Sequence, residues 1–162
     1  MRIILLVVVL IAIFILGIAV GDIGVSKITK KRYENGKKLS YYYYLFNQWL
    51  RLRQNGYTLT EYIKEQGICK VAIYGIAELG QRLFDELVQA GITVEYIIDN
   101  NPMAYFYNYK IVSMKDSLPP VDAIIVTPIL AYDQIKEELG RKVNCPIISL
   151  EMLIYNARKK KS

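Results

Sequence analysis

The sequence predicts an α/β protein with a small doubly wound parallel sheet of about five strands, for which we expect the order 3-2-1-4-5. Three observations support this fold class. Short apolar runs alternate with amphipathic helical patterns over residues 68–157. The runs are rich in β-branched residues, as strands buried on both faces are. Glycine or proline stands at the ends of several runs, where a strand or helix has to stop.

The elements follow one another in a regular order. Val71 begins an apolar run that stops at Gly75, and leucines at helical spacing then continue until Gly91. Two adjacent prolines, Pro119 and Pro120, separate the third strand from the fourth. We expect strands over residues 71–74, 93–98, 110–112, 122–127 and 146–149, and helices over residues 79–88, 130–139 and 150–157.

The turn after the first strand carries a G-x-A-x-x-G frame made of Gly75, Ala77 and Gly80. The first glycine allows a sharp turn, the small residue lets the backbone approach a diphosphate, and the last glycine lets the helix lie close to the strand. Asp99 ends the next strand, where a dinucleotide fold places the carboxylate that holds a ribose hydroxyl. The methyl group of Ala77 and the negative charge of Glu78 both disfavour tight binding of a dinucleotide pyrophosphate.

These features predict a nucleotide pocket at the switch point of the sheet, where the first and fourth strands diverge. The helix N-terminus there offers free N–H groups to an anion. Thr127 can donate a hydrogen bond from its hydroxyl group, and Pro128 fixes the loop that closes the crevice. The residues expected to bind the ligand are Gly75, Ile76, Ala77, Glu78, Leu79, Gly80, Asp99, Asn100, Thr127 and Pro128.

The side chains limit the chemistry. The chain contains no histidine, which removes the commonest general base and the commonest metal ligand. Cys69 and Cys145 are the only cysteines, and they form no metal-type pair. We therefore expect no metal centre, and we expect a nucleotide-sugar or NAD(P) as the ligand.

Residues 1–20 are predicted to form a single transmembrane helix, because Ile3 to Val20 is a run of 18 uncharged residues. At about 1.5 Å per residue this helix would span roughly 27 Å, enough for a bilayer core. A secretory signal peptide is the alternative, but its apolar region is usually only about 7 to 15 residues long. A basic linker is expected over residues 21–36.

The basic residues gather at the two ends of the chain. Residues 1–38 carry seven Lys and Arg against two acids, whereas residues 39–157 have a net charge of −3. A mildly acidic domain argues against a nucleic acid as a partner. The positive-inside rule places the protein in the plasma membrane, with its N-terminus outside and its domain in the cytoplasm. Residues 158–162 form a basic tail, either resting on anionic inner-membrane lipid or disordered and solubilising.

A helical prelude is expected over residues 37–67. Its first helix ends at Asn55, and Thr58 and Glu61 form a capping-box pattern that opens a second helix. The apolar residues of the first helix fall at helical spacing: Leu39, Tyr42, Tyr43, Phe46, Trp49 and Leu50. We interpret Phe46 and Trp49 as packing on the domain core, with an interfacial helix on the membrane as the alternative.

Four segments carry a family resemblance: Ile-Tyr-Gly-Ile-Ala-Glu-Leu-Gly (73–80), Ile-Ile-Asp-Asn-Asn-Pro (97–102), Tyr-Lys-Ile-Val (109–112) and Val-Asp-Ala-Ile-Ile-Val-Thr-Pro (121–128). Over residues 68–150 the chain resembles a Rossmann-like module of bacterial surface-polysaccharide enzymes. It looks like the N-terminal domain of sugar O- and N-acyltransferases, and like the domain before the catalytic part of membrane-bound nucleotide-sugar dehydratases and epimerases. In the acyltransferases the module holds the nucleotide-sugar, so the resemblance implies the glycine turn and Asp99 as ligand contacts.

Neither family's catalytic domain follows the module, so we expect catalysis to come from another chain. The combined expectation is a membrane-anchored sensor or accessory protein that binds a nucleotide or nucleotide-sugar and works with a polysaccharide-biosynthesis enzyme. One alternative is a membrane-tethered protein-interaction domain without a small ligand. Another is an NAD(P)-dependent oxidoreductase or epimerase that uses Tyr132 and Lys136, spaced as in short-chain dehydrogenases. About one such Tyr/Lys pair is expected by chance in a chain with this many tyrosines and lysines.

Overall fold

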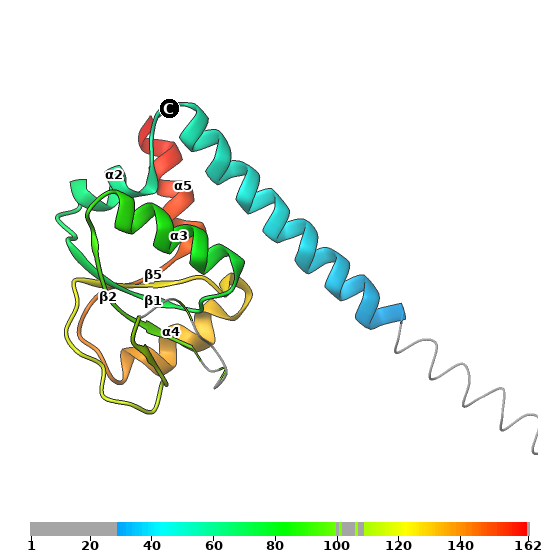
Figure 1. Cartoon of the computed structure of the whole chain (residues 1–162). Coiled ribbons are helices and arrows are strands. Elements are labelled where there is room, and N and C mark those ends of the chain that lie inside the picture. The colour runs from blue at the N-terminus through cyan, green and yellow to red at the C-terminus, as the bar shows by residue number, and fades with distance from the viewer. Residues whose placement is uncertain (1–28, 100, 102–105, 107–108, 162) are drawn as a thin grey trace, which may run out of the picture. The chain divides into compact units, whose positions relative to one another are not determined.

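The computed structural model describes residues 29–99, 101, 106 and 109–161 (Figure 1). The chain divides into two compact units, residues 1–44 and residues 45–162. Residues 29–54 are helical, so the part of the expected linker that is described, residues 29–36, is helix instead. Lys, Arg and Glu are good helix formers, and no proline interrupts them.

The predicted transmembrane helix, residues 1–20, lies outside the described residues, as does the first part of the linker. Among the helices that the structure does describe, none combines the length and the apolar character that a membrane span requires.

The sheet has five parallel strands in the order β3-β2-β1-β4-β5, which confirms the predicted fold class and strand order. Tyr74, the last residue of β1, pairs with Ile98 on one side and with Val126 on the other. The carboxyl ends of these three strands therefore meet at one edge, and the switch point lies between β1 and β4. The strands are β1 (Lys70–Tyr74), β2 (Thr93–Ile98), β3 (Ile111–Val112), β4 (Ala123–Val126) and β5 (Ile147–Ser149).

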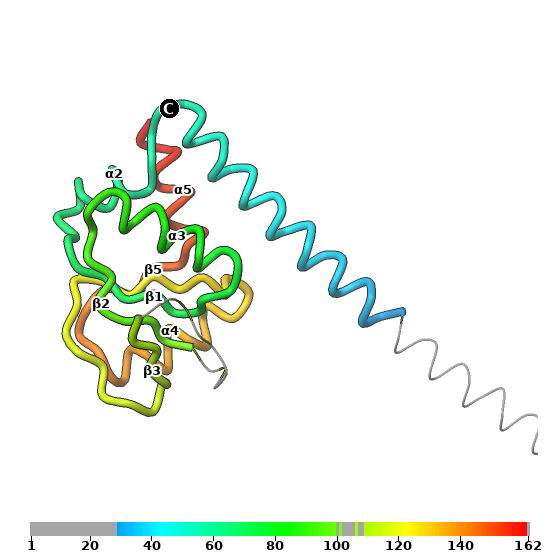
Figure 2. Tube along the Cα trace, in the orientation of Figure 1, coloured from blue at the N-terminus to red at the C-terminus, as the bar shows by residue number. Residues whose placement is uncertain are grey.

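Helices cover both faces of the sheet, α3 and α5 on one side and α4 on the other (Figures 1 and 2). On the α4 side, Ile135 and Leu139 pack on alternate residues of the strands, among them Tyr96 and Ile124. Such alternation buries both faces of a parallel strand. The helices of this unit after residue 54 are α2 (Leu59–Glu65), α3 (Glu78–Gln89), the 3₁₀ turn η1 (Ile129–Ala131), α4 (Tyr132–Gly140) and α5 (Leu150–Lys161).

Local sequence signals set several helix ends. The Thr58–Glu61 capping box opens α2 as predicted, and Gly91, with φ of 77°, follows the end of α3. α4 begins two residues later than predicted, because a 3₁₀ turn follows Pro128. The expectation of a disordered tail was wrong for residues 158–161, which form the last turn of α5. Cations there complement the helix dipole.

The helix over residues 29–54, here called the prelude helix, packs through a different face from the one we predicted. Trp49 is buried, as expected, but Phe46 is 42% exposed, so its predicted place in the core was wrong. The buried side chains are Leu45, Trp49 and Leu52, which are spaced four and three residues apart. This spacing aligns them along one helical face and leaves Leu50, 42% exposed, on another.

A buried carboxylate holds the prelude to the domain. Glu86 of α3 is 4% exposed, and it accepts hydrogen bonds from Trp49 Nε1 (2.9 Å) and from the backbone N–H of Leu59 (2.8 Å). The guanidinium of Arg53 lies 3.6 Å from the same carboxylate. One side chain thus joins α3, the end of the prelude helix and the first turn of α2.

Replacing Glu86 with Ala should lower the free energy of unfolding by about 3 kcal/mol, because a buried indole N–H and a buried amide lose their acceptor. Urea denaturation followed by circular dichroism measures the loss. The control is Asp85→Ala, the next residue of α3, whose ion pair with Arg82 is exposed and should contribute less than about 1 kcal/mol. Equal losses in the two variants would contradict the anchoring role of Glu86.

At the opposite, amino edge of the sheet, Asp122 holds the start of β1. Its Oδ2 accepts from the backbone N–H groups of Cys69 (2.9 Å) and Lys70 (2.7 Å). These two hydrogen bonds lower the pKa of the Asp122 carboxyl below its usual value of 3.8. The ionised carboxylate is therefore the form that the folded state prefers.

The stabilisation from Asp122 should be complete above the pKa of the unfolded chain and should be lost as the pH falls through the lower folded-state pKa. Asp122→Asn should thus reduce the urea midpoint at about pH 7, and the gap to wild type should close below about pH 3. A gap of the same size at both pH values would show that the charge of Asp122 does not contribute.

Candidate functional site

The glycine turn lies at the carboxyl edge of β1, and its shape depends on two glycines. Gly75 has φ of 87°, a region that side chains other than glycine rarely adopt. A Cβ atom on Gly80 would lie 2.1 Å from the carbonyl oxygen of Gly75, far inside van der Waals contact. The first turn of α3 therefore sits directly on this carbonyl group, as the G-x-A-x-x-G frame predicted.

Thr127 closes the switch point from the β4 side. Its side chain is buried, and its hydroxyl group donates to the carbonyl oxygens of Gly75 (2.9 Å) and Tyr74 (3.2 Å). A Cβ atom on Gly75 would also lie 2.9 Å from the ring of Pro128. Thr127 and Pro128 therefore lie at the switch point, and the Thr127 hydroxyl group hydrogen bonds to the backbone of the turn.

Asp99 reaches the glycine turn from the end of β2. One carboxylate oxygen accepts from the backbone N–H of Ile76 (3.0 Å) and the other from that of Asn101 (2.8 Å). A carboxylate has about four acceptor positions, and these two backbone donors occupy two of them. The side chain of Asp99 is half-buried. Asn100, also predicted to bind the ligand, lies outside the described residues.

The N-terminus of α3 follows the turn. Ala77 occupies the N-cap position, and in the described part of the chain its side chain makes no capping hydrogen bond to the N–H groups of the first turn. Together with the helix dipole they favour an anion. Ala77 and Glu78 are both exposed, whereas Ile76 is buried. The Glu78 carboxylate in the first turn therefore opposes a ligand of high negative charge.

One further contact fixes the turn, and the sequence analysis did not find it. The side-chain amide of Gln81 donates to the carbonyl oxygen of Ile76 (3.2 Å). Gln81 follows the last glycine of the frame directly, but a polar residue in the first turn of a helix is too common to signal such a role. With this contact, the carbonyl groups of residues 74–76 all accept from side chains.

The two catalytic candidates do not form a Tyr/Lys acid–base pair. The Tyr132 hydroxyl group donates to the carbonyl oxygen of Ile147 on β5 (2.8 Å), which fixes α4 to the sheet. The ammonium group of Lys136 lies over the Tyr132 ring, 5.7 Å from its centre, and not at the hydroxyl. In this arrangement Lys136 makes a cation–π contact and does not activate the hydroxyl group.

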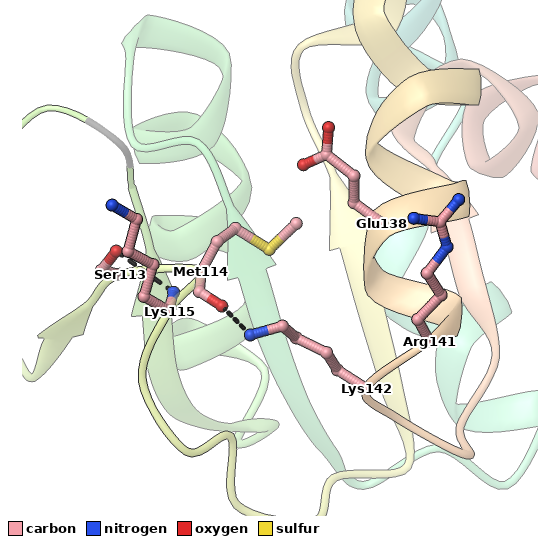
Figure 3. A pocket seen from close by; sticks show the side chains of 6 residues that line it. All are labelled: Ser113, Met114, Lys115, Glu138, Arg141 and Lys142. Carbon is pink, nitrogen blue, oxygen red and sulfur yellow. Dashed lines mark hydrogen bonds between the residues drawn. The ribbon is translucent and has the colours of Figure 1, made fainter.

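Two hollows lie elsewhere on the second unit. The larger, of about 610 Å³, separates the connection after β3 from the end of α4 (Figure 3). Lys142 crosses it and donates to the carbonyl oxygen of Met114 (2.5 Å). The smaller, of about 450 Å³, lies between the end of the prelude helix and the end of α5. Neither coincides with the predicted switch-point pocket, and the described part of the chain holds no cluster of His, Cys, Asp or Glu suited to a metal ion.

Gly80→Ala should lower the free energy of unfolding by more than about 3 kcal/mol, because the new methyl group overlaps the Gly75 carbonyl and displaces α3 from β1. The matched control is Gly140→Ala, also in a helix, where an added Cβ meets no atom within 4 Å. This control should be neutral or up to about 1 kcal/mol more stable. Thermal or urea unfolding of both variants measures the difference, and a neutral Gly80→Ala would refute the close contact.

Comparison of the chain with protein-family models, with curated proteins and with solved structures gives no match. The resemblance of residues 68–150 to the polysaccharide-enzyme module therefore stays a prediction. The features that bear on function are the parallel sheet and the geometry of the glycine turn, Asp99 and the N-terminus of α3.

Proposed function

We propose that this protein binds a nucleotide or nucleotide-sugar at the carboxyl edge of its sheet, as a sensor or accessory protein in surface-polysaccharide biosynthesis. One observation carries the proposal: the Asp99 carboxylate lies against the glycine turn, 3.0 Å from the Ile76 amide, directly before a helix N-terminus without a side-chain cap. An acceptor for ribose hydroxyls and a donor site for phosphate then stand side by side.

The charges around the turn favour a particular class of ligand. Glu78 and Asp99 both lie at the turn, and no cation among the residues that we expect to bind the ligand offsets them. A ligand whose main contacts are sugar hydroxyls suits this surface, because hydroxyl groups donate hydrogen bonds to carboxylates. Nucleotide-sugars carry the hydroxyl groups of a sugar in addition to those of the ribose, whereas those of NAD(P) are all on ribose, so we place nucleotide-sugars first and NAD(P) second.

The cellular setting is part of the same proposal. A transmembrane helix over residues 1–20 would hold the domain at the cytoplasmic face of the plasma membrane, as the charge distribution predicts. A surface-polysaccharide enzyme with its substrates at the same membrane is then the expected partner. Of the alternatives, the interaction domain without a ligand is favoured by the exposed apolar side chains of the prelude helix, with Leu39 71% and Tyr43 68% exposed.

Ligand binding should raise the melting temperature of the full-length protein in detergent, because a ligand that binds only the folded state stabilises it. At a concentration of about 100 times Kd the gain is about 2.7 kcal/mol. The panel comprises UDP-sugars, CMP-sugars, NAD and NADP, and the fluorescence of Trp49, the only tryptophan, reports unfolding. We expect the largest shift with a nucleotide-sugar.

Asp99→Asn should abolish the shift, because the amide nitrogen replaces one acceptor oxygen and removes the charge. The matched control is Asp122→Asn, an aspartate that also accepts two backbone N–H groups but lies at the opposite edge of the sheet. This control should have a lower melting temperature than wild type but should keep the ligand-induced increase in melting temperature. If no ligand moves the wild-type melting temperature, or if both variants respond alike, the proposal fails.

A further inference from the structure

We infer that the hollow between the prelude helix and α5 is a second binding site, which takes a phosphate group. Three cationic side chains line it: Arg51 from the prelude helix, and Arg158 and Lys161 from the last turns of α5. The side-chain amides of Gln54 and Asn55 complete the polar lining. Guanidinium, ammonium and amide groups are the hydrogen-bond donors that bind phosphate oxygens in proteins.

The end of α5 is held in place by contacts that the basic tail of the sequence did not suggest. Lys160 forms an ion pair with Glu65 of α2, and the Tyr57 hydroxyl group donates to the same carboxylate (2.9 Å). The hydrogen bond from Lys160, and to a smaller extent that from Tyr57, lowers the pKa of the Glu65 carboxyl. Lys161 then lies over the Tyr57 ring, 5.8 Å from its centre. The last turn of α5 is therefore fixed beside the end of the prelude helix.

The basic residues are not needed to cap the prelude helix. Its last carbonyl oxygens already accept from backbone N–H groups: Arg51 from Asn55 (3.0 Å), Arg53 from Gly56 (3.0 Å) and Leu52 from Tyr57 (3.2 Å). Gly56, with φ of 72°, makes this Schellman-type ending possible. The position of the Arg51 side chain in the hollow is therefore not explained by a capping role.

The electrostatics of the hollow also point to an anion. Among the described residues, no carboxylate lines the hollow, and Glu65, which holds the end of α5, is paired with Lys160. Folding thus brings Arg51 of the prelude helix and Lys161 of α5 to the same hollow, where their like charges repel each other. A bound phosphate would turn this repulsion into attraction. The phosphate belongs either to a soluble phosphate compound or to the headgroup of an anionic lipid.

This site is distinct from the proposed nucleotide site. α5 begins at Leu150, directly after β5, at the carboxyl edge where the glycine turn also lies. Its 12 residues carry the chain about 18 Å away from that edge before the hollow is reached. The inference therefore stands whether or not the glycine turn binds a nucleotide.

The test uses the full-length protein in detergent with inorganic pyrophosphate as the probe, and binding is measured by isothermal titration calorimetry. Arg51→Gln combined with Lys161→Gln should weaken binding about tenfold. The control, Lys110→Gln combined with Lys159→Gln, removes the same charge from exposed residues outside the lining and should bind like wild type. A second arm measures how much wild type and each variant co-floats with phosphatidylcholine vesicles that contain or lack phosphatidylglycerol.

An effect of the double variant on pyrophosphate assigns the site to a soluble phosphate compound. An effect only on vesicles that contain phosphatidylglycerol assigns it to a lipid headgroup, and either result supports the inference. Equal losses in the double variant and in its control, or no binding by wild type in both arms, would overturn it. If Asp99→Asn abolishes pyrophosphate binding and the Arg51→Gln, Lys161→Gln double variant retains it, then pyrophosphate binds at the glycine turn. This result would also overturn the inference of a second site.

Discussion

The structure of the carboxyl edge depends on one close contact, between the carbonyl group of Gly75 and the first turn of α3. The missing side chain of Gly80 lets the helix approach, and the Thr127 hydroxyl group donates to the same carbonyl oxygen from β4. A buried carbonyl without a donor would cost about 1–3 kcal/mol. β1, β4 and α3 thus meet at this carbonyl oxygen, and their contact positions the glycine turn and the N-terminus of α3.

Glu86 extends this arrangement to the rest of the second unit. It lies on the same helix as Gly80, two turns further along, and binds the Trp49 indole and the first amide of α2. The prelude is therefore attached to the helix that forms the candidate site. The end of the prelude helix in turn supplies Arg51 to the hollow beside α5. One rigid helix, α3, connects the glycine turn with the segment that carries the basic site.

The sequence could predict the features that depend on neighbouring residues. The strand order follows from the alternation of buried strands and helices, and the turn at Gly75 and the capping box at Thr58 follow from local chemistry. It could not predict contacts between distant residues. Phe46 and Trp49 fit the same helical stripe, but Trp49 is the buried one, and it donates to the Glu86 carboxylate 37 residues away. For the same reason the sequence could not predict that the Thr127 hydroxyl group donates to the carbonyl oxygen of Gly75, 52 residues earlier in the chain.

The two candidate sites would bind phosphate through different interactions, backbone N–H groups at one and side-chain cations at the other. At the glycine turn the donors are backbone N–H groups, their positions are fixed by the fold, and the nearby carboxylates Glu78 and Asp99 limit the total attraction for an anion. Binding there would depend on shape and on hydroxyl contacts, and only weakly on ionic strength. At the hollow beside α5 the attraction comes from exposed side-chain cations, which salt screens over a Debye length of about 8 Å at physiological ionic strength. If both proposals hold, the acidic site would select among ligands and the basic site would attract any accessible phosphate, so the specificity of binding would come from the carboxyl edge.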